Sequence, residues 1–413
     1  MINEKDLNNL ADEVYLVDKN KAKKDKIESW REGDIIKGGE LTQGYKVLKA
    51  EDNTDNGMQA MAVAPVDDAG NVDTSQVVIA YAGTNFSDAK DRATDIQTVA
   101  GGDKQLAVNP YLETAGQAIT AQDFADIISE KYPNAIITTT GHSLGEYLAL
   151  MIASENQWRN VGFNGPDPYG ILSADAKKWI KNNPGMLTNY RNRGDSAIGN
   201  LMGNGTGAQI KVSLEMGLDN PLTYHSLSVW KFDDNGNLII PNNKYNKKAM
   251  RQQAERVLMT QFVASMYALK ALEALFRSSG GGLSSNEQFY LDASQANSVV
   301  ETASRSLKLA MANVIILYQE AIEDAEKLWN TGLTKARGSA SKLSGSEIEE
   351  ALSSVGTTQS TVISDPSEEY REKINEAKEI GESFDILANE IKGQIDLVVQ
   401  KDQELAQQLK VRL

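Results

Sequence analysis

Ser143 is the residue whose setting most clearly indicates chemistry. It lies in the stretch TTTGHSLGEYLAL, which contains the pattern glycine-x-serine-x-glycine. A serine hydroxyl is a weak nucleophile, so the chain must present it at a sharp turn, beside a base and beside donors for a developing oxyanion. The apolar run Asn134–Thr140 predicts a buried strand leading into this turn, and a helical pattern follows from Glu146. This strand–turn–helix context predicts that Ser143 is a nucleophile.

The base that a serine nucleophile requires is restricted by composition, because the chain has only two histidines, His142 and His225. His142 is adjacent to the serine and is held by the turn, so we expect a structural role for it. His225, in PLTYHSLSVW, is therefore predicted as the general base and acid, in a loop just before a strand.

The acid that orients the histidine is expected between the serine and the histidine in the chain, in the order that this type of fold uses. Asp195 is preferred because it follows the strand-like run Leu187–Tyr190, which brings its carboxylate to the sheet edge where the serine turn opens. Asp167, in FNGPDPYG, is the alternative. The remaining carboxylates in this interval are less favoured: Asp175, Asp219 and Glu215.

The oxyanion requires two donors. One is expected to be the backbone N–H of Leu144, at the start of the helix that follows the serine. For the second we expect Thr84, in VVIAYAGTNFSD, where a strand ends beside a glycine. An ordinary turn threonine explains the same residue equally well on this pattern alone.

The elements around these residues mix strands and helices. After an opening helix near Glu4–Lys24, the runs Tyr45–Ala50 and Gln59–Val66 predict a hairpin, and Gln76–Tyr81 predicts a buried strand. Later segments predict a helix and four more strands: Tyr111–Lys131 for the helix, and Val161–Asn164, Leu187–Tyr190, Ser228–Phe232 and Leu238–Ile240, the last two paired, for the strands. Strands alternating with helices predict an α/β domain, residues 1–245, with a mainly parallel sheet covered on both faces.

The character of the sequence changes at about Asn246, where strand signals end and long helical patterns begin. Residues 246–413 are therefore predicted to form an all-α domain. Apolar residues recur at steps of three, four and seven: Phe289, Ala293, Ala296, Val300, Ala303, Leu307, Ala310, Val314 and Leu317, and then Ala377, Phe384, Ile391, Val398 and Leu405. Such stripes indicate the core of a helical bundle or, on some faces, a surface for another chain.

Composition excludes several classes of function. The formal net charge of −15 over 413 residues disfavours a nucleic-acid partner. Cysteine is absent, so disulfides and thiolate metal sites are excluded. The amino terminus lacks the pattern of a cleavable signal peptide, and the apolar windows Leu309–Tyr318 and Met259–Phe276 are too short or too charged to predict a membrane span.

The motifs together resemble the class 3 lipases, a family of α/β-hydrolases. The resemblance covers about Tyr45–Phe232 and rests on AGTNFSDAKDRATDI, TGHSLG, FNGP and YRNRGDSAIG, in that order. It places Thr84 on the oxyanion position, Asp95 on the acidic position after it, Asp195 on the acid and His225 on the base. Glu146 and Ala82 depart from the family, where a second glycine and an arginine are usual.

The resemblance implies hydrolysis of acyl esters of glycerolipids, of the triacylglycerol lipase or phospholipase A type, with no metal or organic cofactor. Residues 96–112, which contain a flexible GGD, are expected either to open as a lid at a lipid surface or to form a plain connecting loop. GHSLGEYLAL also resembles the serine turn of malonyl-CoA:ACP transacylases. That family carries a PGQGSQ-type segment and an arginine after the serine, which this chain lacks, so we reject this alternative.

The carboxy-terminal half resembles the helical LXG-type targeting domains of Gram-positive toxins. This similarity implies an antibacterial lipase toxin exported by type VII secretion without a cleavable signal peptide, with small helical partner proteins on the carboxy-terminal helices and an immunity protein. The alternative is a cytoplasmic carboxylesterase whose helical domain caps or dimerises it.

Overall fold

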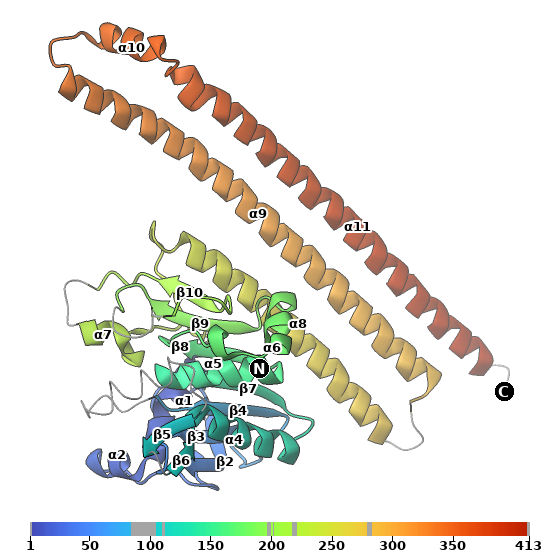
Figure 1. Ribbon diagram of the computed structural model, residues 1–413. Coiled ribbons are helices and arrows are strands. Elements are labelled where there is room, and N and C mark those ends of the chain that lie inside the picture. Colours follow the sequence, from blue (N-terminus) through green and yellow to red (C-terminus); the bar gives the residue numbers. More distant parts are fainter. Residues whose placement is uncertain are drawn as a thin grey trace. The chain divides into compact units, whose positions relative to one another are not determined.

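The computed structural model describes residues 2–83, 105–109, 112–195, 200, 202–216, 221–278 and 283–410 (Figure 1). The chain forms two compact units, Met1–Arg256 and Val257–Leu413. The predicted fold class, an α/β unit with a mainly parallel sheet followed by a helical region, is confirmed. The first unit includes the start of helix α8 (Lys247–Ser278), where Ala249 packs into the α/β core and Gln253 Nε2 donates to the Leu238 carbonyl at 2.5 Å.

The first unit is built on an eight-stranded sheet in the order β1-β2-β3-β4-β7-β8-β9-β10. Strands β1 to β4 pair antiparallel, and β4, β7, β8, β9 and β10 pair parallel. Their bounds are Ile35–Ile36, Gly44–Asp52, Gln59–Val66, Gln76–Tyr81, Ile136–Gly141, Arg159–Phe163, Leu187–Asn192 and Gln209–Val212. A separate hairpin joins β5 (Gln105–Asn109) and β6 (Leu112–Ala115).

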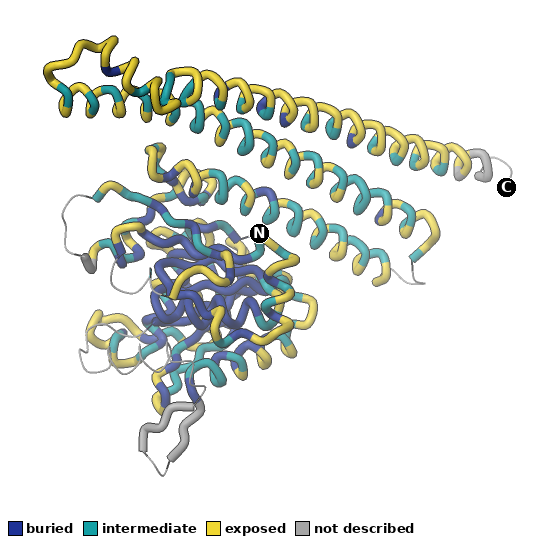
Figure 2. The backbone as a smooth tube through the Cα atoms, turned by 45° about the horizontal axis from the view of Figure 1, so that its top comes forward, coloured by how far each residue is buried: buried dark blue, intermediate teal, exposed yellow. Residues whose placement is uncertain are grey.

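Successive side chains of a strand point to opposite faces of the sheet, so the sheet contributes residues to a core on each face. In β4, Val78 and Ala80 enter the core that includes α1 (Glu4–Glu13), whereas Val77 and Ile79 enter the opposite core. The second core is formed with α4 (Gln117–Lys131), α5 (Leu144–Asn156) and α6 (Ala174–Asn182). Figure 2 shows that the buried residues are concentrated in the interior of this unit. Because the strands from β4 to β10 in the sheet order run parallel, their carboxyl ends lie at the same edge of the sheet.

Local chemistry explains where the structure differs from the predicted elements. The opening helix is broken into α1, a 3₁₀ turn η1 (Val14–Val17) and α2 (Lys19–Lys24), because the Asp18 side chain accepts the Asn20 N–H and begins a new helix. The paired strands predicted at 228–232 and 238–240 are wrong. The first segment begins as a 3₁₀ turn η3 (Leu227–Val229), with Ser226 Oγ accepting the Ser228 N–H, and only the bridge Phe232–Leu238 is sheet-like.

The helical unit contains the long helices α9 (Ser285–Ser339) and α11 (Asp365–Lys410), joined by α10 (Gly345–Ser354) and a π-helical turn η4 (Ser360–Ser364). Helices α9 and α11 lie side by side and antiparallel, as the Ser304–Asp385 hydrogen bond of 2.7 Å and the Tyr318–Tyr370 ring contact of 5.5 Å show (Figure 1). Of the predicted heptad stripe, Ala377 is buried, but Val398 is 52% and Leu405 is 59% exposed. Two helices alone therefore bury only part of the stripe.

No helix among the described residues is long and apolar enough to cross a membrane.

Candidate active site

The elbow that carries Ser143 joins β7 directly to α5. Ser143 has φ 59° and ψ −129°, a conformation that costs a non-glycine residue about 1–3 kcal/mol. The flanking glycines permit the turn, because a Cβ on Gly141 would collide with the backbone of Gly145, and a Cβ on Gly145 would collide with the Tyr81 carbonyl. The serine side chain is buried, and its hydroxyl has no hydrogen-bond partner among the described residues. The turn thus holds a strained serine whose side chain is buried.

His225 and Asp195 form a buried pair at the same sheet edge. His225 ends the short helix α7 (Pro221–His225), not a loop, and its Nδ1 lies 2.7 Å from Asp195 Oδ2. Asp195 follows β9 through a tight turn in which its N–H donates to the Asn192 carbonyl at 3.1 Å. A carboxylate acceptor on Nδ1 favours the tautomer whose Nε2 carries a lone pair and accepts a proton. The structure therefore brings together the histidine and the aspartate that the sequence singles out.

Asp167, the alternative acid, has a different setting. Its Oδ2 accepts from the Thr206 N–H at 3.1 Å and from the Thr206 hydroxyl at 2.6 Å, and its Oδ1 accepts from the Tyr169 N–H at 2.9 Å. These bonds fasten the loop after β8 to the loop before β10. Asp175 and Glu215 are exposed, and Asp219 lies outside the described residues.

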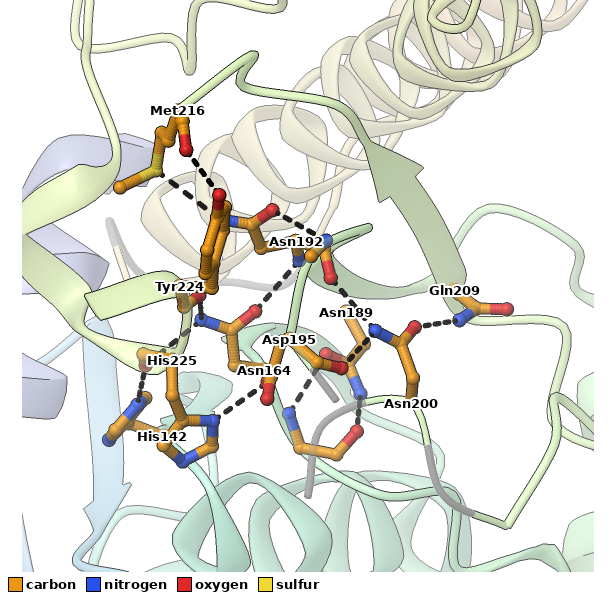
Figure 3. A network of polar contacts seen from close by, with 12 residues as sticks. His142, Asn164, Asn189, Asn192, Asp195, Asn200, Gln209, Met216, Tyr224 and His225 are labelled. Carbon is orange, nitrogen blue, oxygen red and sulfur yellow. Dashed lines mark hydrogen bonds and ion pairs between the residues drawn. The ribbon is translucent and has the colours of Figure 1, made fainter. Parts of the chain in front are cut away.

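Asn164 connects the pieces of this site, and sequence reasoning missed it. Its Nδ2 donates to the His225 carbonyl at 3.1 Å, and its Oδ1 accepts the Asn192 N–H at 2.9 Å (Figure 3). It is fully buried directly after β8 and has a φ of 52°. The available signal was a polar residue directly after a buried strand, in FNGP. Asn164 therefore joins the turn before Asp195 to the helix that ends at His225.

His142 is a second contact of the His225 backbone. Its Nε2 lies 2.7 Å from the His225 carbonyl oxygen, and the two ring centroids are 4.7 Å apart (Figure 3). Burial, followed by the neighbouring His225, lowers the pKa of His142 to about 3, so this ring is neutral at ordinary pH. His142 is the residue before Ser143, so the elbow itself holds His225.

Of the two expected oxyanion donors, Leu144 lies among the described residues and Thr84 does not. Leu144 is the first residue of α5, and N–H groups in a first helical turn lack acceptors inside the helix. Thr84, Asp95 and the Ile96–Lys104 part of the expected lid lie outside the described residues, while 105–109 and 112 belong to the β5–β6 hairpin. Gly83, the residue before Thr84, lies against the elbow, since a Cβ there would stand 2.7 Å from the His142 carbonyl.

Glu146 is a carboxyl group buried beneath the elbow. Its Oε1 accepts from Asn160 Nδ2 at 2.7 Å, and its side chain occupies the space that Cβ atoms on Gly162 and Gly165 would need. Burial raises the pKa of Glu146 well above its usual value, against smaller lowering effects of Asn160 and Arg191. A buried carboxyl group thus fills the space beneath the elbow.

A cleft of about 780 Å³ borders this network. His142, Tyr15, Leu227, Trp230 and Phe232 contribute to its wall, together with lysines and carboxylates of the first helices. Within the described residues, no cluster of three or more histidine and carboxylate side chains is arranged to hold a metal ion.

Comparison with known proteins gives structural similarity only. No family model matches the chain, and no curated protein matches its sequence. Among solved structures, a mutant of MDLA from Penicillium cyclopium is 15% identical, with 59% of this chain and 86% of that chain covered and a TM-score of 0.35. A fungal lipase is 14% identical over 51% of this chain and 78% of its own, with a TM-score of 0.34. The Rhizomucor miehei lipase in complex with its propeptide is 15% identical over 47% and 62%, with a TM-score of 0.28. The similar structures are thus fungal lipases at low identity, and the case for chemistry rests on the geometry described above.

Proposed function

We propose that this chain is a serine ester hydrolase in which Ser143 is the nucleophile, His225 the general base and acid, and Asp195 the carboxylate that orients the imidazole. One observation carries the proposal. The strained elbow at Ser143 belongs to the same buried network that holds the His225–Asp195 pair at 2.7 Å, through the His142 contact with the His225 carbonyl. A strained serine, a histidine and a carboxylate in one network are what acyl transfer requires.

The reaction follows from these roles. Ser143 Oγ forms a bond to the ester carbonyl carbon while its proton passes to His225 Nε2, and the carbonyl oxygen becomes an oxyanion beside the Leu144 N–H and, as we propose, Thr84. The carbon–alkoxy bond then breaks, and the alcohol leaves with the proton from His225. Water adds to the acyl-enzyme by the same route and releases the carboxylic acid, which restores the serine hydroxyl. No metal or organic cofactor takes part in this scheme.

The proposed substrates are acyl esters of glycerolipids, as for a triacylglycerol lipase or phospholipase A. The support is the resemblance of the ordered motifs to those of the class 3 lipases. The first test measures release of fatty acid from phospholipid micelles and from emulsified triacylglycerol. The two substrates separate the phospholipase from the neutral lipase.

Ser143→Ala should abolish release of fatty acid from both substrates. The matched control is Ser154→Ala, since Ser154 is also fully buried on α5 but its hydroxyl donates to the Leu150 carbonyl at 2.6 Å. Ser154→Ala should retain activity. Undiminished release by Ser143→Ala would overturn the nucleophile assignment.

We also propose that the protein is an antibacterial toxin exported by type VII secretion, with small helical partner proteins on the carboxy-terminal helices and an immunity protein. The support is the resemblance of the helical half to LXG-type domains and the exposed apolar residues of α11, of which Leu397 is 49% and Val398 52% exposed. Co-expression with helical partners should give a larger complex, and replacing both residues with aspartate should release the partner while ester hydrolysis remains. A chain that purifies alone and is harmless when directed to membranes would instead indicate the cytoplasmic carboxylesterase.

A further inference from the structure

Tyr15 brings the amino-terminal segment to the elbow. It lies in the 3₁₀ turn η1 and is almost fully buried, far from the elbow in sequence. Its hydroxyl is 3.1 Å from His142 Nδ1 and 3.5 Å from the His142 carbonyl oxygen. The Gly83 N–H also donates to this hydroxyl. One phenol therefore contacts both the serine elbow and Gly83, two residues after the end of β4.

The direction of each hydrogen bond in this chain of contacts is fixed by elementary chemistry. The His225 carbonyl only accepts, so His142 Nε2, 2.7 Å away, must carry a hydrogen. Because His142 is neutral, its Nδ1 then carries a lone pair and accepts from the Tyr15 hydroxyl. The Tyr15 oxygen in turn accepts the Gly83 N–H. We call this series of hydrogen bonds, from Gly83 through Tyr15 and His142 to the His225 carbonyl, the relay. Each of its groups has a defined role as donor or acceptor.

This relay ends on the backbone of the residue that we propose as the base. The His225 carbonyl receives two donors, His142 Nε2 and Asn164 Nδ2, at 2.7 and 3.1 Å. The Asp195 carboxylate holds the other end of the same residue, at Nδ1 of the ring. Because both the backbone carbonyl and the ring Nδ1 of His225 are hydrogen-bonded, the orientation of its imidazole is restricted.

We propose that Tyr15 and His142 are positioning residues that aim the His225 imidazole through its backbone carbonyl. This inference rests on the proposed function. Tyr15 lies in η1, between α1 and α2, so the amino-terminal segment takes part in positioning the base. The same hydroxyl also holds Gly83, the residue directly before Thr84 in the sequence. The base and Gly83 are thereby held by one side chain.

The test compares variants that remove single groups of this relay. Tyr15→Phe removes only the hydroxyl, and His142→Leu removes both ring nitrogens. His142→Gln keeps an amide donor at the Nε2 position. The matched control is Tyr45→Phe, since the Tyr45 hydroxyl is also buried and donates to Asp6 Oδ2 at 2.6 Å, within the core on the same side of the sheet.

The kinetic readout is kcat and KM for a soluble p-nitrophenyl ester, with stability measured in parallel. Tyr15→Phe and His142→Leu should each lower kcat by about tenfold or more, with KM changed less than about twofold, because a misaligned base slows proton transfer without removing substrate contacts. His142→Gln should recover most of kcat. Tyr45→Phe should lose comparable stability and keep kcat.

The inference is overturned if Tyr15→Phe lowers kcat no more than Tyr45→Phe does, or if His142→Gln is as slow as His142→Leu. Failure of the proposed function has a different signature, because Ser143→Ala would then remain active. An inactive Ser143→Ala together with fully active relay variants would reject the relay alone.

Discussion

Replacing Asp195 with asparagine tests the electrostatic part of the proposed site. The substitution keeps the shape of the side chain and removes its charge. In the wild type, Asp195 Oδ2 lies 2.7 Å from His225 Nδ1, and both side chains are buried. The carboxylate therefore faces the positive charge that develops on the imidazole when it takes the proton from Ser143.

The size of the expected effect follows from this distance. A full charge pair at 2.7 Å in a medium of effective dielectric constant about 20 is worth about 6 kcal/mol. Each 1.4 kcal/mol of transition-state stabilisation is roughly a factor of ten in rate, so Asp195→Asn should lower kcat by roughly 10⁴-fold. The amide can also turn its NH₂ towards Nδ1, which would stabilise the unproductive tautomer and act in the same direction.

The assay is ester hydrolysis under saturating substrate, with Asp167→Asn as the control. Asp167 bonds to Thr206 and Tyr169, so its substitution should reduce stability and leave kcat within a few-fold of wild type. A loss of less than about tenfold for Asp195→Asn, or a larger loss for Asp167→Asn, would refute the assignment of the acid.

Two further substitutions test the packing of the elbow. Burial raises the folded pKa of Glu146 above the value of 4.5 that applies when the chain is unfolded, so wild-type stability should fall as pH rises above 4.5, by at most about 1.4 kcal/mol per pH unit. Glu146→Gln keeps the acceptor for Asn160 and cannot ionise. In chemical denaturation this variant should be more stable than wild type at pH 7.5, and the difference in unfolding free energy should shrink towards pH 4.5. A difference that grows on acidification would contradict this prediction. Gly145→Ala places a Cβ against the Tyr81 carbonyl and should cost about 1–3 kcal/mol of stability and most of the activity. The control is Gly170→Ala, which should be neutral because nothing lies within 4 Å of the added Cβ. Equal melting temperatures and rates for the two variants would show that the close approach at Gly145 is unimportant.

The part of the site that the sequence predicts is the part that local chemistry determines. The Ser143 turn is specified by glycines and an adjoining apolar strand within a dozen residues, so its pattern is readable along the chain. Asp195 is recognisable because it follows a strand, and carboxyl ends of parallel strands share an edge. The roles of Ser143, His225 and Asp195 remain predictions that the experiments above address.

The parts that were missed depend on residues far apart in sequence. Tyr15 contacts the elbow and Asn164 contacts His225 through three-dimensional packing. The sequence marks Asn164 only as a polar residue directly after a buried strand, and no local pattern identifies the partner of either residue. β10, with the short sequence QIKV, was missed because it is half-buried at the sheet edge and carries little hydrophobic signal. The 228–232 segment begins as a 3₁₀ turn in place of the predicted strand, because the Ser226 hydroxyl accepts the Ser228 N–H, and the Trp230 ring then packs against Phe163 and Tyr190.

The measurement that tests the central claim most directly is the location of a covalent adduct formed with a fluorophosphonate ester. Such a reagent phosphonylates a serine only when a base activates it, so peptide mass spectrometry should find one adduct, on Ser143. The adduct should be absent from His225→Ala and from protein denatured before labelling. An adduct on another serine, or none on Ser143 in active protein, would contradict the account.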